Sequence, residues 1–467
     1  MNVTTTHLSA NGHRRHRKRK HIMAPEYLPT SLMDMPDELL LQIIEYLHVI
    51  RSDQPQSQAF KVKEMERARQ CENSVRQKTL YALCLSSRRL KGMSEPTLYS
   101  AFLGSSTWRG FNPIRRFYKT ILRRQDLAAR VQYVENRLSD HLGNGLYDDM
   151  EFYGAVEMVQ EYFSTLASII RLAENIEHLS VVSLETLEVS LWSQLVYNEM
   201  PSPIAVHGFP KLQTMCLQIQ TEDYGLSDGA AWFQRICDNL TKVPTLKSLR
   251  ASGVVGSDPY HPFTGTFKNL DTIEISECIL DFEEVEQLTS ACENLKHFSC
   301  QWAFLNCHVS DQPSDLFPGL LIHKDSLESL YLDLRESRHH PGSLAPRSLG
   351  SFRDFISLKS IAICEGTLLA TRHSILDFPD QHLSQRIAEL MPPNLEILTL
   401  LLQSDHGYND DFRIDEAVAL WDLAEDCENL LPNLKEVQIR SAHVIAGPNL
   451  NEQFRKVGVD LRYIQES

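Results

Sequence analysis

Several features common in other protein classes are missing from this sequence. In its 467 residues no apolar run approaches the roughly 18 residues that a membrane-spanning helix needs. No apolar core follows the basic run near the N-terminus, so we expect no secretory signal. The ten cysteines are scattered and include no Cys-x-x-Cys pair, which argues against a disulfide framework and against a RING-type zinc site. We therefore expect a protein of the cytoplasm or nucleus, without a membrane partner.

Motifs for enzymatic chemistry are also missing. The sequence has no G-x-G-x-x-G after a strand, no P-loop and no G-x-S-x-G. Cys300, Cys307 and His308 form the densest group of metal-ligand residue types, but their spacing matches no common zinc site. Adjacent carboxylates such as Glu283 and Glu284 lie in a helical context typical of a solvated face. We expect no catalytic residues, no metal and no cofactor.

Charge is distributed unevenly along the chain. Residues 1–25 carry six Lys/Arg and no acid, so the net charge of −15 becomes −21 for the remainder. An acidic body argues against binding to nucleic acid as the main task. We expect residues 1–28 to be a disordered basic tail. The basic run at 14–20 is a candidate nuclear-import signal, and a solvated tail without such a role is the alternative.

Helical patterning begins near Met35. Pro36 suits the first turn of a helix, and Asp37 and Glu38 would lie at the positive end of its dipole. An apolar face follows at helical spacing, formed by Leu39, Leu40, Ile43, Ile44 and Leu47. The pattern predicts a helix over 36–47.

The next segment, residues 51–77, is polar and charged. We interpret it as an inserted loop, in which residues from about 60 to 72 could form a solvated helix. Apolar helical spacing then resumes at Leu80, Leu83, Cys84 and Leu90. Pro96 should direct Glu95 out of the helical region and end this helix.

A short pattern, apolar-x-x-apolar-x-apolar, recurs nine times at intervals of 24 to 39 residues. Its units are Ile176/Leu179/Val181, Leu212/Met215/Leu217, Leu246/Leu249/Ala251, Leu270/Ile273/Ile275, Leu295/Phe298/Cys300, Leu327/Leu330/Leu332, Leu358/Ile361/Ile363, Leu395/Leu398/Leu400 and Leu434/Val437/Ile439. Val131 and Val134 are a candidate tenth unit. Helical spacing separates many units, so strand and helix alternate. Such units cannot close a core alone, but stacked units bury a continuous one.

The array resembles leucine-rich repeats (LRRs), whose consensus is L-x-x-L-x-L-x-x-N/C-x-L. One unit fits throughout, at Leu270, Ile273, Ile275, Cys278 and Leu280, and the others keep only the strand half. The resemblance implies an α/β fold over 120–467: an irregular solenoid with a curved parallel sheet, outer helices and a C-terminal helix–strand cap. A plain α/β domain with a parallel sheet is the alternative.

Residues 31–102 resemble the F-box, whose pattern is roughly L-P-x-E-[LI]-[LI]-x-x-I-x-x-[YF]-L followed by a half rich in Leu, Cys/Ser and Arg that closes near P-x-L-[YW]. The first half here reads MPDELLLQIIEYL, with Met35 in place of the leading Leu. The second half reads LYALCLSSRRL from Leu80, then PTLY from Pro96. The insert at 51–77 is the main departure from the pattern.

This resemblance implies a small helical module that docks the Skp adaptor and, through it, the cullin and RING subunits of a ubiquitin ligase. A module this small leaves apolar side chains exposed unless a partner covers them. The implied adaptor-binding residues are Pro36, Leu39, Leu40, Ile43, Leu47, Leu83, Leu90, Pro96 and Leu98. For each residue taken singly, ordinary core packing is the alternative.

In an LRR strand, the residues between the apolar positions face away from the core. Among those residues we select Arg250, Glu274, His297 and Tyr331 as candidate contacts to a target protein, since Arg and Tyr are favoured anchors. An ordinary wet surface is the alternative for each.

The sequence therefore supports a non-catalytic substrate receptor of an SCF-type (Skp–cullin–F-box) E3 ubiquitin ligase, resembling the fungal F-box/LRR style, that acts in ubiquitin-dependent degradation. Its reaction would depend on proximity supplied by other subunits. Two other hypotheses stay open: an F-box/LRR scaffold without ubiquitin transfer, and an enzyme with an unrecognised α/β site.

Overall fold

The computed structural model describes residues 32–52, 63–104, 111–137, 152–185, 190–192, 194–195, 203–221, 233–256, 263–303, 305–307, 312–339, 348–369, 385–402, 417–441 and 447–465. The expected tail at 1–28, its basic run, and residues 53–62 of the insert lie outside them. The chain divides into two compact units, residues 1–46 and residues 47–467, and each is described by itself.

In the first unit a 3-10 turn, η1 (Leu32–Asp34), precedes helix α1 (Asp37–Glu45), so the helix expected at 36–47 is present. Pro36 is its N-cap, with extended backbone angles (φ −55°, ψ 149°). Asp37 and Glu38 occupy the first turn, where their charges favour the helix dipole.

The second unit opens with two helices that pack along each other, α2 (Lys63–Ser86) and α3 (Arg88–Leu98). The helix that the sequence allowed at about 60–72 is present from Lys63, but the loop expected after it, up to residue 77, is wrong, because α2 runs without interruption into the second half of the module. Its high content of Glu, Arg and Gln favours helix even without an apolar face.

The expected helix end at Pro96 is also wrong, since α3 continues through Pro96 to Leu98. A proline so close to the end of a helix removes one backbone donor, and the hydrogen-bond pattern resumes at once. The Tyr99 N–H donates to the carbonyl of Glu95 at 3.1 Å.

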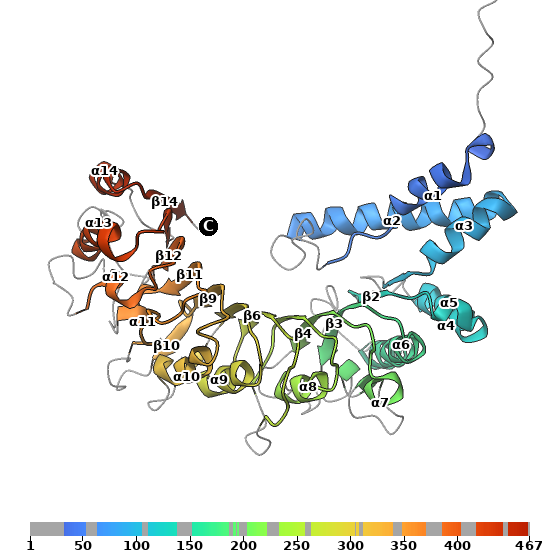
Figure 1. The fold of residues 1–467 in the computed structure, drawn as a ribbon. Helices are drawn as coiled ribbons and strands as arrows, with labels where there is room; N and C mark the ends of the chain where they lie inside the picture. The colour runs from blue at the N-terminus through green and yellow to red at the C-terminus, as the bar shows by residue number, and fades with distance from the viewer. Residues whose placement is uncertain are drawn as a thin grey trace, which may run out of the picture. The chain divides into compact units, whose positions relative to one another are not determined.

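Twelve parallel strands form one sheet in which the spatial order equals the chain order (Figure 1). They are β1 (Ala101–Leu103), β2 (Tyr133–Asn136), β3 (His178–Glu185), β4 (Thr214–Thr221), β5 (Ser248–Ser252), β6 (Thr272–Cys278), β7 (His297–Trp302), β9 (Ser329–Asp333), β11 (Ser360–Cys364), β12 (Ile397–Leu401), β13 (Glu436–Ser441) and β14 (Asp460–Gln465). A second small sheet pairs β8 (Leu305–Cys307) with β10 (Ser337–His339). This arrangement is an α/β fold of solenoid-like order.

All nine repeated apolar triplets are buried. Each lies on or just before one strand from β3 to β13, and none of the 27 side chains exceeds 5% exposure. The tenth unit is present as β2, with Val131 and Val134 fully buried. The structure adds β1, which the sequence did not suggest, and the C-terminal cap is present as α14 and β14.

Helices cover one face of the sheet, where the core lies (Figure 1). They are α4 (Phe111–Arg123), α5 (Gln125–Ala128), α6 (Phe152–Leu172), α7 (Pro203–His207), α8 (Phe233–Leu240), α9 (Phe282–Ser290), η6 (Pro313–Leu316), α10 (Phe317–Leu321), α11 (Glu365–Leu369), α12 (Ile387–Leu390), α13 (Val418–Leu430) and α14 (Pro448–Lys456). We call the opposite face, which carries the residues between the apolar positions, the open face.

Two isoleucines five residues apart test the role of the triplets. Ile361 on β11 is fully buried, whereas Ile356 is 60% exposed. We expect Ile361→Ala to lower the free energy of unfolding by about 2–5 kcal/mol, because it removes buried methyl groups and leaves a cavity. Ile356→Ala should stay within about 0.5 kcal/mol of the native protein. Urea unfolding followed by circular dichroism measures both, and equal effects would contradict the assignment of the triplets to the core.

Candidate partner-binding surfaces

Helix α1 exposes part of its apolar surface. Leu39 is 43% exposed and Ile43 is 41% exposed, and Pro36 is exposed as well. Leu40 and Ile44, on another side of the helix, are 2% and 3% exposed. The expected docking set on α1 is therefore mixed, with Leu40 buried and the other three residues accessible.

The remaining expected docking residues belong to the second unit, with Leu47 at its start and the others on α2 and α3. Leu90 is buried at 3% exposure. Four others are partly covered: Leu47, Leu83, Pro96 and Leu98. Among the exposed apolar side chains here, Tyr81 (58%) and Leu85 (70%) share one side of α2 at i, i+4 spacing. Sequence reasoning missed both, because Leu80 and Leu83 beside them carry the same helical pattern.

The candidate target-binding residues lie together on the open face. Strand pairing places the central residue of each strand in one row. From β2 to β13 this row is Glu135, Ser180, Cys216, Arg250, Glu274, Ser299, Tyr331, Ala362, Thr399 and Gln438. Arg250, Glu274 and Tyr331 are members of it, and His297 lies two residues before Ser299 on β7.

Exposure along this row divides it into segments. At β2, β3 and β4 the residues are buried, at 3%, 1% and 1% exposure. At β5, β6, β7 and β9 they are partly exposed, and at β11 and β12 they are buried again, at 8% and 4%. The accessible window from β5 to β9 holds all four candidate target contacts.

Side chains in this window already interact with one another. Arg250 Nε donates to the carboxylate of Glu274 at 2.8 Å, with both side chains partly exposed. His297 Nδ1 lies 2.9 Å from the hydroxyl of Ser329. The Tyr331 hydroxyl donates to Asp333 at 3.1 Å, and burial together with the charge of Asp333 raises the pKa of this phenol, so it remains a hydrogen-bond donor.

A buried ionic cluster joins α2 to the open face of β2. Arg69 on α2 donates two hydrogen bonds to the two oxygens of Glu135, at 2.9 and 2.6 Å, and these side chains are 2% and 4% exposed. Arg69 also pairs with Glu66 at 2.6 Å. Arg137 lies 3.3 Å from Glu135 and 3.4 Å from Glu66. Two arginines and two glutamates therefore balance each other in charge.

Ile50 and the first residues of the insert lie against the same cluster. The Ser52 N–H donates to the Tyr133 hydroxyl at 3.0 Å, and the hydroxyl of Ser52 donates to that of Ser180 at 2.9 Å. The Tyr133 hydroxyl in turn donates to Glu135. Asn73 of α2 bonds both the N–H and the carbonyl of Ile50, at 2.7 and 2.9 Å. We call residues 50–52 and these partners, with the ionic cluster, the α2 clamp.

Electrostatics within the clamp favour the charged form of Glu135. Burial alone would raise its pKa, but attraction from Arg137 and the hydrogen bonds and charge of Arg69 outweigh burial, so the pKa lies below the usual 4.5. The helix expected at about 60–72 is therefore not solvated on this side, because Arg69 is 4% exposed, and one turn further along α2 Asn73 is 2% exposed.

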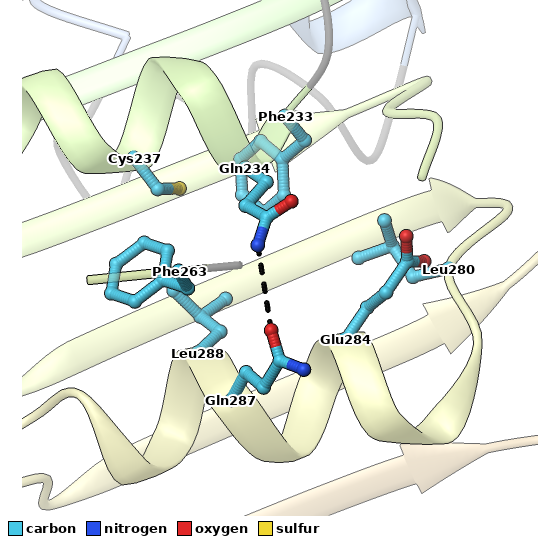
Figure 2. A pocket seen from close by; sticks show the side chains of 8 residues that line it. All are labelled: Phe233, Gln234, Cys237, Phe263, Leu280, Glu284, Gln287 and Leu288. Carbon is cyan, nitrogen blue, oxygen red and sulfur yellow. Dashed lines mark hydrogen bonds between the residues drawn. The ribbon is translucent and has the colours of Figure 1, made fainter. Parts of the chain in front are cut away.

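A small pocket lies on the helical face, between α8 and α9 (Figure 2). Phe233, Gln234, Cys237, Phe263, Leu280, Glu284, Gln287 and Leu288 line it, and Gln234 donates to Gln287 across it at 3.4 Å. Burial raises the pKa of the Cys237 thiol well above its ordinary value, which keeps it protonated. The Glu284 carboxylate accepts from the N–H of Asp281 at 2.9 Å in a capping box. Neither group is placed as an activated nucleophile or base.

Metal-ligand residue types do not gather within the described residues: no group of three or more His, Cys, Asp or Glu could hold a metal there. Cys300 lies buried with its sulfur 3.6 Å from that of Cys278. The side chain of Cys307 and the whole of His308 lie outside the described residues. None of the helices that the structure describes is both long and apolar enough to cross a membrane.

A scan against protein-family models finds no match to this chain, and no curated protein matches its sequence. The functional argument therefore depends on the geometry of helix α1, of the α2–α3 pair and of the open face. No sequence signal joins Arg69 to Glu135, because 66 residues separate them. Charge at the central position was no guide either, because Arg250 and Glu274 occupy the same position on β5 and β6.

The clamp generates a pH-dependent stability prediction. We expect Glu135→Gln to lower the free energy of unfolding at pH 7 by about 3–5 kcal/mol, because Arg69 and Arg137 are left buried without their carboxylate. Since the pKa of Glu135 is lowered in the folded state, its stabilisation is present above pH 4.5 and is lost as the pH falls below that value. Urea unfolding at several pH values should show the difference from the native protein shrinking below pH 4.5.

Glu161→Gln is the matched control. Glu161 accepts two hydrogen bonds from Arg115, at 2.9 and 2.6 Å, but these side chains are 50% and 46% exposed. Because solvent screens this exposed ion pair, Glu161→Gln should hardly change the free energy of unfolding. Equal effects of the two substitutions would show that burial does not strengthen the clamp.

Proposed function

We propose that this protein is the substrate-recognition subunit of an SCF-type E3 ubiquitin ligase. In this proposal α1 and the α2–α3 pair form the F-box, which docks the Skp adaptor. The repeats form an irregular, curved LRR solenoid that binds a target protein. The protein itself contributes no reaction, and it works in the cytoplasm, the nucleus or both.

The observation that carries the proposal is the exposed apolar surface on α1. Leu39 and Ile43 are each more than two-fifths exposed, although they occupy defined positions of the F-box pattern. Leaving such side chains in water is unfavourable, and covering the two-fifths of each that is still exposed contributes about 1 kcal/mol. In the second unit, Tyr81 and Leu85 on α2 are a further exposed apolar pair that we assign to adaptor binding.

The window from β5 to β9 supports the second half of the proposal. It offers hydrogen-bond donors, acceptors and one aromatic ring on a rigid parallel sheet, which suits recognition of a folded or extended protein surface. Ubiquitin transfer would follow because the complex holds the target near the RING subunit, so catalysis is proximity. A scaffold role without ubiquitin transfer is the alternative, and it predicts adaptor binding without cullin in the complex.

Adaptor docking is tested by Leu39→Asp combined with Ile43→Asp. Charged side chains at two apolar contacts should weaken binding to a purified Skp adaptor by about 30-fold or more, since truncation of a single anchor often exceeds 1 kcal/mol. Isothermal titration calorimetry measures the affinity. Ile356→Asp, at a 60% exposed site on the array, should bind as the native protein does.

If the native protein does not bind an adaptor at all, the proposal fails. If it binds the adaptor and cullin is never found in the same complex, the scaffold alternative replaces it. If a target protein accumulates in cells from which this protein has been removed, that result supports the ligase function over the scaffold role.

Target binding is tested by Arg250→Ala combined with Tyr331→Ala. We expect the pair to remove from affinity purifications those proteins that the native chain captures through its open face, because both residues lie in the accessible window. Mass spectrometry with isotope-labelled reference samples measures the ratios, which should fall about tenfold or more. Arg455→Ala, on the exposed side of α14, should leave the ratios unchanged. A target retained equally by both variants binds elsewhere, and its retention contradicts the assignment of the window.

A further inference from the structure

Helices α2 and α3 are joined to the array in two separate regions, the end of α3, where Glu95 also pairs with Arg124 at 3.4 Å, and the first half of α2. The first is covalent: after Leu98 only Tyr99 and Ser100 precede strand β1. The second is the α2 clamp on β2 and β3. A single short connection would let a helical pair pivot, whereas two separated attachments define its orientation.

The geometry of the clamp makes its opening energetically unfavourable. Its central ion pair is bidentate and almost completely buried, and opening it would place an unpaired charge in a low-dielectric site. Ser52 and Tyr133, each 1% exposed, add hydrogen bonds that depend on the same closed arrangement. These bonds reach two different strands, because Ser52 also bonds Ser180 on β3.

Helix α2 connects the clamp to the proposed adaptor surface without interruption. Arg69 lies near its beginning, and Tyr81 and Leu85 lie near its end. The twelve residues from Arg69 to Tyr81 span about 18 Å of straight helix. Any change in how Arg69 is held therefore moves the exposed apolar residues at the other end.

We propose that Arg69 and Glu135 are positioning residues that hold the docking helices α2 and α3 at one orientation to the repeat array. The inference rests on the proposed function for its biological meaning. It assigns a role to the described parts of the segment at 51–77: through Ser52 and Arg69 the chain occupies the open face over β2 and β3 with its own residues. The open face is thereby divided, with β2 and β3 holding the docking helices and β5 to β9 left for the target.

Orientation is measured on the full chain without any partner. Nitroxide labels are placed at Lys91→Cys on α3 and Arg455→Cys on α14, with the accessible Cys71 and Cys84 replaced by serine. Pulsed electron paramagnetic resonance then gives the distribution of distances. We expect one narrow distribution for the intact clamp and, for Arg69→Met, a distribution at least about twofold broader, because the buried pair is lost. An unchanged narrow distribution in Arg69→Met overturns the proposal.

Arg115→Met is the matched control for this measurement. It removes a bidentate Arg–Glu pair of similar geometry from the surface, so the distances should not change. Urea unfolding of the array checks that Arg69→Met remains folded. If Arg69→Met does not fold, Arg69→Lys takes its place: it keeps the charge but loses the two-point geometry, and it should broaden the distribution to a smaller extent.

A disulfide provides an independent readout. Ser52→Cys and Ser180→Cys replace two hydroxyls that lie 2.9 Å apart, so mild oxidation should link them quickly in the otherwise native chain. We expect the link to form about tenfold more slowly in the Arg69→Met background. Ser52→Cys with Ser299→Cys, on β7 in the same row, should not form a link. Equal rates in both backgrounds count against the positioning role.

Both measurements use the protein alone, so they stand even if the adaptor never binds. Within an assembled ligase, Arg69→Met should keep its adaptor affinity but lower the rate of ubiquitin transfer to the target about tenfold, because the target is held at varying distances from the RING subunit. Loss of adaptor affinity in this variant instead would contradict a purely positioning role for Arg69.

Discussion

Burial of the repeated apolar triplets is the constraint on which the rest of the array depends. A single strand with its helix exposes one side of its triplet, so each unit requires the next unit in the chain to cover it. This need explains why the twelve strands lie in chain order and pair in parallel without a skipped position. It also explains why intervals between units can vary widely, since only the triplet takes part in the stacking.

The same constraint leaves the open face free to vary. Residues between the apolar positions have no core to fill, so they can carry charge, hydroxyls or aromatic rings at no cost to the fold. Along the central row this freedom is used in two ways. At β5 to β9 the side chains stay partly exposed and pair with close neighbours, and at β2 a glutamate is buried under a helix that the repeats do not supply.

A buried glutamate is stable only where opposite charge and hydrogen bonds replace water. Arg69 and Arg137 meet this requirement for Glu135, and Glu66 balances the second arginine. Because Arg69 belongs to α2, satisfying one charge on the sheet also places a long helix. The structure thus converts an electrostatic requirement at one strand into an attachment between helix α2 and the array.

The triplet pattern in the sequence was sufficient to locate nine strands, the tenth unit and the C-terminal cap, because burial of every second strand residue is a local and periodic property. The acidic start after Pro36 likewise located α1. It was also possible to choose Arg250, Glu274, His297 and Tyr331 as neighbours, since parallel strands in one register bring equal positions together. The sequence did not separate the exposed from the buried members of the implied adaptor-binding set. A helical pattern shows which residues share a side of the helix, but not that Leu40 is covered and Leu39 is exposed.

Tertiary structure alone decided the rest. The continuation of α3 through Pro96, strand β1 at Ala101–Leu103, and the exposure of Tyr81 and Leu85 depend on packing that no local pattern encodes. The pairing of Arg69 with Glu135 is the clearest case: two ordinary charged residues, 66 positions apart, become a buried bond only when the fold brings α2 onto the open face. The sequence by itself determined that this protein stacks strand and helix units behind a helical module. The tertiary structure decided how that module is attached and which part of the face remains open, because ion pairs between distant segments follow from the folded arrangement and leave no periodic trace in the chain.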